Sequence, residues 1–78
     1  MNFVHVVIID PNGLEYEADI DEDSEEESLL IQIVEELNLG DPNDFEMFID
    51  TFGLKDGSRL KISQKEPPRY IKNLQKRD

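Results

Sequence analysis

The chain has 78 residues, a length at which one folded domain with a single hydrophobic core is expected. Its 37% apolar and 35% charged residues predict a small domain with a well-solvated surface. The absence of cysteine excludes disulfides, thiolate nucleophiles and cysteine metal centres. The sequence has no apolar run long enough to span a membrane and no secretory-signal pattern at its start, so we expect a cytoplasmic protein.

The charged residues are divided between two parts of the chain. Residues 1–54 contain sixteen acidic side chains and no Lys or Arg, whereas residues 55–78 contain all eight basic side chains. An acidic body repels phosphates and favours encounter with basic protein surfaces, so we expect protein partners and no nucleic acid for this body. The other interpretation of the net charge of −11 is solubility alone.

The first third of the sequence predicts a β-hairpin. Residues 2–9 form a β-branched run typical of a central strand. Asp10-Pro11-Asn12-Gly13 has the composition of a tight turn. Apolar and acidic residues then alternate over residues 14–20, which is the pattern of a strand with one buried face. The apolar side chains expected to face the core are Leu14, Tyr16, Ala18 and Ile20.

A helix is predicted after this hairpin. Ser24 followed by Glu27 matches a capping box, which makes Ser24 the expected N-cap. Apolar residues then recur with helical spacing and form one stripe. The stripe consists of Leu30, Ile33, Val34 and Leu37, with Leu29 beside it. Gly40 and Pro42 are expected to terminate the helix.

Two further strands are predicted in the second half of the chain. The first covers residues 45–49, with Phe45, Met47 and Ile49 on one face and Phe48 on the other. Asp56-Gly57 is a turn signal, and residues 59–63 then alternate with Leu60 and Ile62 facing inward. We therefore expect a domain over residues 1–63, followed by a basic C-terminal tail over residues 64–78 that is flexible or forms a short helix.

The order strand, strand, helix, strand, strand predicts an α+β fold of the β-grasp type. In this arrangement the helix packs on one face of a mixed four-stranded sheet, and the first and last strands are parallel neighbours at its centre. The expected strand order is 2-1-4-3. The alternation pattern is also compatible with a plain antiparallel sheet covered by one helix.

The sequence resembles ubiquitin and its relatives in the order of its elements over residues 2–63. The similarity is greatest from Leu54 to Ile62, where a buried aliphatic residue, a polar turn and alternating core residues lead into the last strand. The same segment is similar to small ubiquitin-like proteins of bacterial type VII secretion systems. The resemblance implies a ubiquitin-like fold. Such a fold hosts many functions, so the pattern by itself does not specify one.

Two features depart from the ubiquitin pattern. Conjugated modifiers of this kind end in Gly-Gly, and the sequence contains no Gly-Gly pair. Covalent attachment of the chain as a modifier is therefore disfavoured. The connection over residues 50–58 is also shorter than the corresponding segment of ubiquitin.

Members of the ubiquitin family bind partners through the sheet face opposite the helix. The matching outward positions are Phe48, Lys61 and Ser63, with Asn12 and Gly13 at the turn. On the first strand, Val4, Val6 and Ile8 are expected in the core. We expect the outward residues to form a partly apolar contact patch in which Phe48 lies beside Phe3 and Val7. The predicted protein-binding residues are Phe3, His5, Val7, Phe48, Lys61 and Ser63.

Catalytic and metal-binding patterns are weak in this sequence. The alternation of Asp19, Asp21 and Asp23 is similar to the start of a calcium loop. However, Ser24 stands at the required Gly position and Leu30 at that of the bidentate Glu. His5 is the single histidine and has no partner in sequence to complete a metal or catalytic set. We expect no enzyme activity and no cofactor.

The basic tail is the other candidate binding segment. Its basic and apolar side chains would suit an acidic partner, the phosphates of RNA, or the acidic face of the domain itself. In another interpretation the tail covers the open sheet face, and in a third it is disordered and only balances charge. The residues concerned are Arg69, Tyr70, Ile71, Lys72 and Leu74.

These observations predict a non-covalent protein-interaction module. The resemblance to secretion-system proteins implies an accessory component of a bacterial assembly or secretion apparatus. A small non-catalytic regulatory subunit of a multicomponent enzyme is the alternative, because β-grasp subunits without active sites occur in such complexes. The partner and the oligomeric state are not determined by the sequence.

Overall fold

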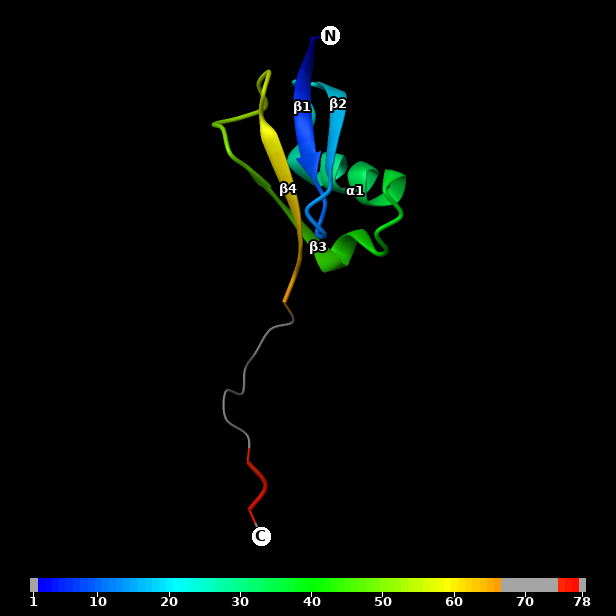
Figure 1. The fold of residues 1–78 in the computed structure, drawn as a ribbon, viewed down its shortest axis with the longest axis vertical. Helices are drawn as coiled ribbons and strands as arrows, with labels where there is room; N and C mark the ends of the chain where they lie inside the picture. The colour runs from blue at the N-terminus through cyan, green and yellow to red at the C-terminus, as the bar shows by residue number, and fades with distance from the viewer. Residues whose placement is uncertain (1, 67–74, 78) are drawn as a thin grey trace.

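The computed structural model describes residues 2–66 and 75–77. The elements follow in the order β1 (Phe3–Ile9), β2 (Glu15–Asp21), α1 (Glu26–Glu36), η1 (Pro42–Asp44), β3 (Phe45–Ile49) and β4 (Arg59–Gln64). The four strands form one sheet, and α1 lies on one side of it (Figure 1). The predicted order of elements is therefore confirmed.

The sheet has the order β2-β1-β4-β3. β1 pairs antiparallel with β2 and parallel with β4, while β3 pairs antiparallel with β4. The parallel pair at the centre is the feature predicted for a β-grasp. It excludes the plain antiparallel sheet that the alternation pattern had left open.

The core lies between the sheet and α1. β1 and β4 are the central strands, and their inward side chains are the most deeply buried, with Val6, Leu60 and Ile62 at 0% exposure. Alternate residues point to opposite faces of a strand, so the period-two pattern placed these side chains correctly. The complete core is Val4, Val6, Ile8, Ile20, Leu29, Ile33, Val34, Phe45, Leu60 and Ile62.

The helix begins one residue later than the capping box predicts. Glu25 is the N-cap, and no side chain caps the helix there. Ser24 instead belongs to the turn after β2, where its N–H donates to the carbonyl of Asp21 at 3.0 Å. The expectation for Ser24 was wrong because Ser24 is part of this turn, and the N-cap position falls on Glu25. Glu26 and Glu27 lie in the first turn, where acidic side chains complement the helix dipole.

The helix ends at Glu36, before the glycine that was expected to stop it. Asn38 adopts a left-handed conformation with φ 55°. The N–H groups of Asn38 and Leu39 donate to the carbonyls of Glu35 and Val34, which closes the C-terminus. Asparagine tolerates this conformation better than most residues, so the chain turns here without glycine.

Two apolar side chains at the start of β2, Leu14 just before the strand and Tyr16 within it, are more exposed than the alternation predicts. Leu14 is 59% exposed and Tyr16 is 37% exposed, whereas Ile20 is buried. α1 makes more close contacts with β3 and η1 than with β2, and the side chains at the start of β2 stay partly exposed. The expectation that Leu14 and Tyr16 are buried in the core was therefore wrong, although β2 has the predicted orientation.

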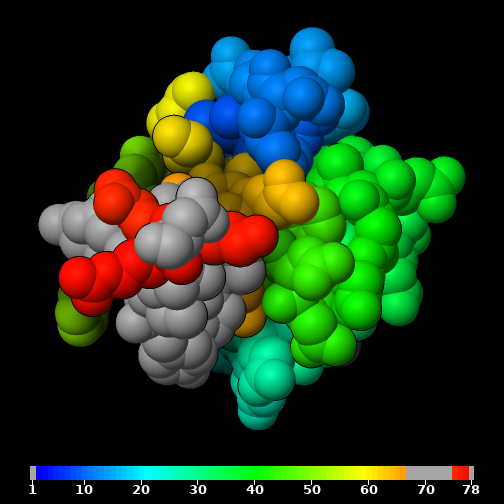
Figure 2. All heavy atoms as spheres, turned by 90° about the horizontal axis from the view of Figure 1, so that it is seen from below, coloured from blue at the N-terminus to red at the C-terminus, as the bar shows by residue number. Residues whose placement is uncertain are grey.

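The last described hydrogen bonds of the sheet lie at the C-terminal end of β4. The last pair between β3 and β4 joins Phe45 and Gln64, and the N–H of Lys65 donates to the carbonyl of Asp44 at 2.7 Å. Figure 2 looks at this end, with the β1–β2 turn in blue, the end of β4 in orange and the region of η1 in green. Among the described residues, no helix has the length and apolar character to cross a membrane.

Candidate functional site

The sheet face turned away from α1, here called the open face, carries the residues predicted to bind a partner. On β1, Phe3 and His5 are exposed and Val7 is half-buried, while their neighbours Val4 and Val6 are in the core. On β3, Phe48 is 54% exposed. The open face therefore displays the side chains that the alternation pattern assigned to it.

Strand register arranges these side chains in rows across the sheet. One row runs through Glu15, Ile9, Lys61 and Phe48, which are paired from β2 to β3. The next row runs through Glu17, Val7 and Arg59. The first strand thus presents apolar residues, flanked by acidic β2 on one side and basic β4 on the other.

The register separates the aromatic residues that were expected to form one patch. Phe48 lies directly opposite Lys61, and β4 stands between it and Val7. Phe3 is six positions from Ile9 along β1, about 20 Å at roughly 3.3 Å per residue. The expectation that Phe48 lies beside Phe3 and Val7 was therefore wrong. Phe48, Lys61 and Ser63 remain neighbours, and we call them the Phe48 surface.

An ion pair crosses the first strand on the open face. Nη2 of Arg59 donates to Oε1 of Glu15 at 2.6 Å, from β4 to β2. The side chains of Val7 and Ile9 lie on the strand between these two partners and are only partly exposed. Both charged side chains are about half exposed, so solvent screens the pair and its contribution to stability is small.

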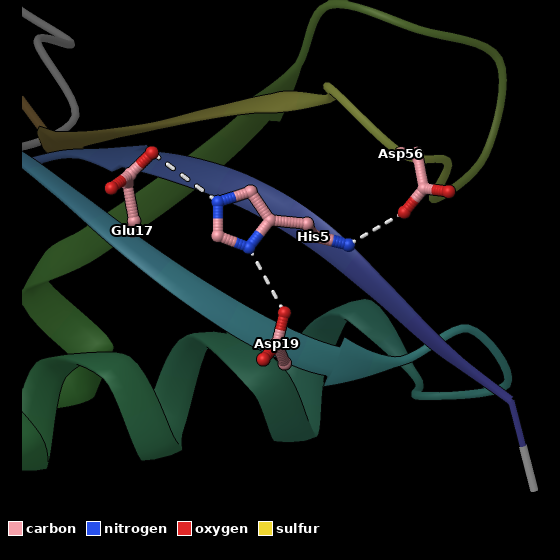
Figure 3. A network of polar contacts seen from close by, with 4 residues as sticks. All are labelled: His5, Glu17, Asp19 and Asp56. Atoms are coloured by element: carbon pink, nitrogen blue, oxygen red, sulfur yellow. Dashed lines mark hydrogen bonds and ion pairs between the residues drawn. The ribbon is translucent and has the colours of Figure 1, made fainter.

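His5 is held between two carboxylates of β2 (Figure 3). Its Nδ1 lies 2.9 Å from Oδ1 of Asp19, and its Nε2 lies 3.3 Å from Oε1 of Glu17. A carboxylate on each ring nitrogen suits the doubly protonated imidazolium, because both nitrogens then donate. Hydrogen bonds to Asp19 and then Glu17 raise the pKa of His5 above its usual 6.5.

The main chain of His5 is also bound by the β3–β4 connection. Its N–H donates to Oδ1 of Asp56 at 2.8 Å, and its carbonyl accepts from the N–H of Gly57 at 2.7 Å. The turn at Gly57 has φ 87°, a conformation that glycine adopts without steric cost. The connection thus continues the contact between β1 and β4 beyond the ladder itself.

The remaining sequence-predicted residues are more scattered. Asn12 and Gly13 are exposed at the β1–β2 turn. Arg69, Tyr70, Ile71, Lys72 and Leu74 lie outside the described residues. Within the described part of the chain, no three His, Cys, Asp or Glu side chains converge to hold a metal ion. The open face offers apolar contact and charge pairing.

A groove on the other side of the sheet was not predicted from the sequence. It lies between β2 and α1 and has a volume of about 440 Å³. The alternation pattern had placed Tyr16 and Ala18 beneath the helix, so it gave no signal for an opening there. Sequence reasoning also did not single out Phe52, which is 97% exposed in the β3–β4 connection.

Comparison with solved structures shows which fold this is. A designed protein based on ubiquitin matches with a TM-score of 0.66 and 14% identity, over 88% of this chain and 96% of the designed one. Ubiquitin from Caldiarchaeum subterraneum matches with a TM-score of 0.66 and 9% identity, over 85% of this chain and 98% of that chain. No protein-family model and no curated protein matches the sequence. The chain has the ubiquitin-like β-grasp fold, and at these identities the likeness is one of fold.

Proposed function

We propose that this chain is a non-catalytic protein-binding module that recognises its partner non-covalently through the Phe48 surface. The observation that supports the proposal is the position of Phe48, which is 54% exposed and paired with Lys61 on an edge strand. Aromatic side chains such as this phenylalanine are enriched at protein contact sites.

The energetics favour Phe48 as the anchor of such a contact. A phenylalanine side chain brings a large apolar area at low conformational cost, and a buried aromatic anchor is typically worth about 2 kcal/mol or more in binding. Because Phe48 is outside the core, replacing it removes binding area without opening a cavity in the domain.

The partner we favour is a component of a bacterial assembly or secretion apparatus. This finer proposal is supported by the similarity of the segment Leu54–Ile62 to small ubiquitin-like proteins of type VII secretion systems. The alternative is a regulatory role in a multicomponent enzyme. The protein captured in a pull-down distinguishes these two roles. A regulatory role requires capture of a large oxygenase or synthase.

The proposal is tested with two aromatic variants in a pull-down from bacterial extract. Phe48→Ala should abolish capture of the protein that the unaltered chain retains. Phe52→Ala is the matched control, since it removes an equally large and even more exposed ring from another surface. We expect Phe52→Ala to retain the captured protein, and both variants to keep the amide spectrum of the parent.

Equal capture by Phe48→Ala and the parent would overturn the assignment of this surface. Turnover of a substrate by the purified chain alone would overturn the proposal that it is non-catalytic.

A further inference from the structure

β3 is an edge strand, and part of its backbone is unpaired. It bonds to β4 on one side, and no described strand lies on its other side. Asp44 and Asp50, which flank β3, each make a backbone hydrogen bond to the β4 segment, at 2.7 Å and 3.2 Å. Bonded positions alternate in an antiparallel ladder, so the even-numbered residues of β3 bond to β4. The N–H and C=O groups of Met47 and Ile49 therefore point away from the sheet.

The residues at these outward positions are apolar. Met47 and Ile49 pack against the core but are only partly buried. Phe45 offers its carbonyl to the edge, because its N–H donates to the carbonyl of Pro42. Edge strands are commonly protected against pairing by charged residues or proline within the strand. Glu46 is the one charged residue within β3, so this edge is poorly protected.

The opposite edge of the sheet disfavours pairing with a second copy of the chain. By the same alternation, the residues of β2 with outward backbone groups all carry carboxylates, which two copies would bring together. The neighbour of β3 is instead β4, which carries Arg59 and Lys61. A second copy therefore meets less repulsion at β3. The acidic outward residues of β2 are Glu15, Glu17, Asp19 and Asp21.

An ion pair within the domain shows that charges on the open face can bridge an intervening strand. Arg59 of β4 reaches past β1 to Glu15 of β2, at 2.6 Å. A basic side chain, an apolar strand and a carboxylate thus follow one another across the sheet. The row of Lys61 and Phe48 begins in the same way, but it ends at Phe48 because β3 is the edge. A second β3 strand would supply the carboxylate, from its Glu46.

We propose that two copies of the chain pair through their β3 edges, antiparallel, and form one continuous sheet. The two-fold axis passes beside Met47, because this register overlaps the whole of Phe45–Ile49 in both copies. The N–H of Met47 donates to the carbonyl of Met47 in the second copy, and that of Ile49 donates to the carbonyl of Phe45. Both copies carry α1 on the same side of the joined sheet.

This register also places opposite charges across the open face. Glu46 of each copy lies opposite Phe48 of the other, and Lys61 follows on the far side of that ring. The assembly closes at two copies, because the acidic β2 strands form both outer edges. The β3 pairing does not require that the Phe48 surface binds another protein, so either assignment can fail alone.

Sedimentation equilibrium of the full-length chain tests the association over a concentration series that reaches the millimolar range. We expect a reversible equilibrium between monomer and dimer. Sodium chloride should favour the dimer, because screening reduces the repulsion between two copies of net charge −11. A chain that stays monomeric at every concentration and salt level would overturn the proposal, and so would assemblies larger than a dimer.

Isotope-filtered NMR on a mixture of labelled and unlabelled chain locates the contact. Glu46 and Phe48 of the second copy form a pair without direct backbone bonds, in which the Cα atoms approach to about 4.5 Å. We expect an intermolecular signal between the Hα atoms of these two residues. Amide exchange of Met47 and Ile49 should slow as protein concentration rises, while that of Glu17 on β2 should not. Intermolecular signals at β2 instead would overturn the β3 edge as the interface.

Met47→Pro and Met47→Ala form a matched pair of variants. The N–H of Met47 points away from β4, so proline there removes an edge donor and retains the existing ladder. Both variants remove the same side chain. We expect Met47→Ala to dimerise within about threefold of the parent and Met47→Pro to dimerise at least about tenfold more weakly. Equal dissociation constants of the two variants would overturn backbone pairing at this edge.

Charge substitutions test the register without altering the backbone. Glu46→Lys and Asp23→Lys make the same change in net charge, and Asp23 is exposed in the turn after β2. Asp23→Lys should not weaken the dimer, because it only lowers the general repulsion. Glu46→Lys should weaken the dimer at least about threefold, because the new cation then faces Lys61 of the second copy.

Adding Lys61→Glu to the Glu46→Lys chain should restore the dimer at the net charge of the parent. If Met47→Pro loses the folded amide spectrum, these charge variants decide alone. Dimerisation of Glu46→Lys that equals or exceeds that of the parent would overturn the proposed register.

Discussion

His5 shows how one residue can connect two strands and a loop. Its ring contacts two carboxylates of β2, and its main chain is bound by Asp56 and Gly57. Sequence alone identified His5 as an outward residue without a chemical partner. Its partners come from the hairpin register, which places Asp19 directly opposite His5. We therefore interpret His5 as a charged cross-strand contact on the open face.

The pKa of His5 provides the first prediction at this scale. Titration by NMR should give a pKa above 6.5, because the hydrogen bonds to Asp19 and Glu17 favour the protonated ring. Asp19→Asn should lower this pKa more than Glu17→Gln, since the bond to Asp19 is the larger cause. A pKa unaffected by either substitution would contradict the contact.

The same contact makes stability depend on pH. A pKa raised by folding stabilises the protein most below the unfolded value of 6.5, and this contribution is lost as the pH rises through the folded value. The difference in unfolding free energy between the parent and His5→Gln should therefore be larger near about pH 5.5 than near about pH 9. Urea denaturation at the two values checks this, and a constant difference would contradict it.

At the scale of the elements, β4 is a central strand whose inward side chains lie in the core. Leu60 and Ile62 are completely buried, while Lys61 between them is exposed. Ile62→Ala should cost about 2–5 kcal/mol of unfolding free energy, because it leaves a cavity among packed neighbours. Lys61→Ala in the same strand should change it by less than about 0.5 kcal/mol. Urea denaturation measures both changes. Equal losses of unfolding free energy for Ile62→Ala and Lys61→Ala would contradict the assigned faces of the strand.

The β3–β4 connection is stabilised by a buried hydroxyl. Ser58 is 0% exposed, and its Oγ accepts the N–H of Lys55 at 2.9 Å and lies 2.5 Å from Oγ1 of Thr51. Ser58→Ala leaves that N–H without this acceptor, a loss of about 1–3 kcal/mol. Amides over residues 51–58 should then exchange faster with solvent. Ser63→Ala is the control, because Ser63 is less buried and lies within a strand.

At the scale of the whole molecule, the last backbone bond of the sheet among the described residues involves residue 65. The final ladder pair is Phe45–Gln64, and Lys65 adds one bond to Asp44. The domain boundary at residue 63 stays a prediction, which a fragment of residues 1–66 tests. A fragment of residues 1–66 should fold with the amide spectrum of the parent over β1 to β4. Loss of the sheet signals would contradict an independent domain.

This fragment should also respond more strongly to salt. Removing residues 67–78 takes away four basic side chains and one acidic side chain from a chain of net charge −11. The fragment is therefore more acidic, and screening its self-repulsion should raise its thermal midpoint more than that of the full chain. Melting curves at low and high sodium chloride check this, and identical salt responses would contradict it.

The elements and most of their faces could be predicted from local sequence patterns. Alternation along a strand is a local property, so Val4, Val6, Leu60 and Ile62 could be assigned to the core and Phe48 to the open face. The order of the elements and the turn at Gly13 were also readable, because each depends on only a few adjacent residues.

How these faces meet could not be predicted from local patterns and is seen in the folded domain. The register of β1 against β4 separates Phe3 from Phe48, and the packing of α1 on the sheet leaves a groove between β2 and α1 beside the partly exposed Tyr16. Register and helix position depend on packing between residues far apart in the chain. Local periodicity carries no information about such packing. The candidate surfaces therefore follow from the assembled sheet, while the side chains that compose them follow from the sequence.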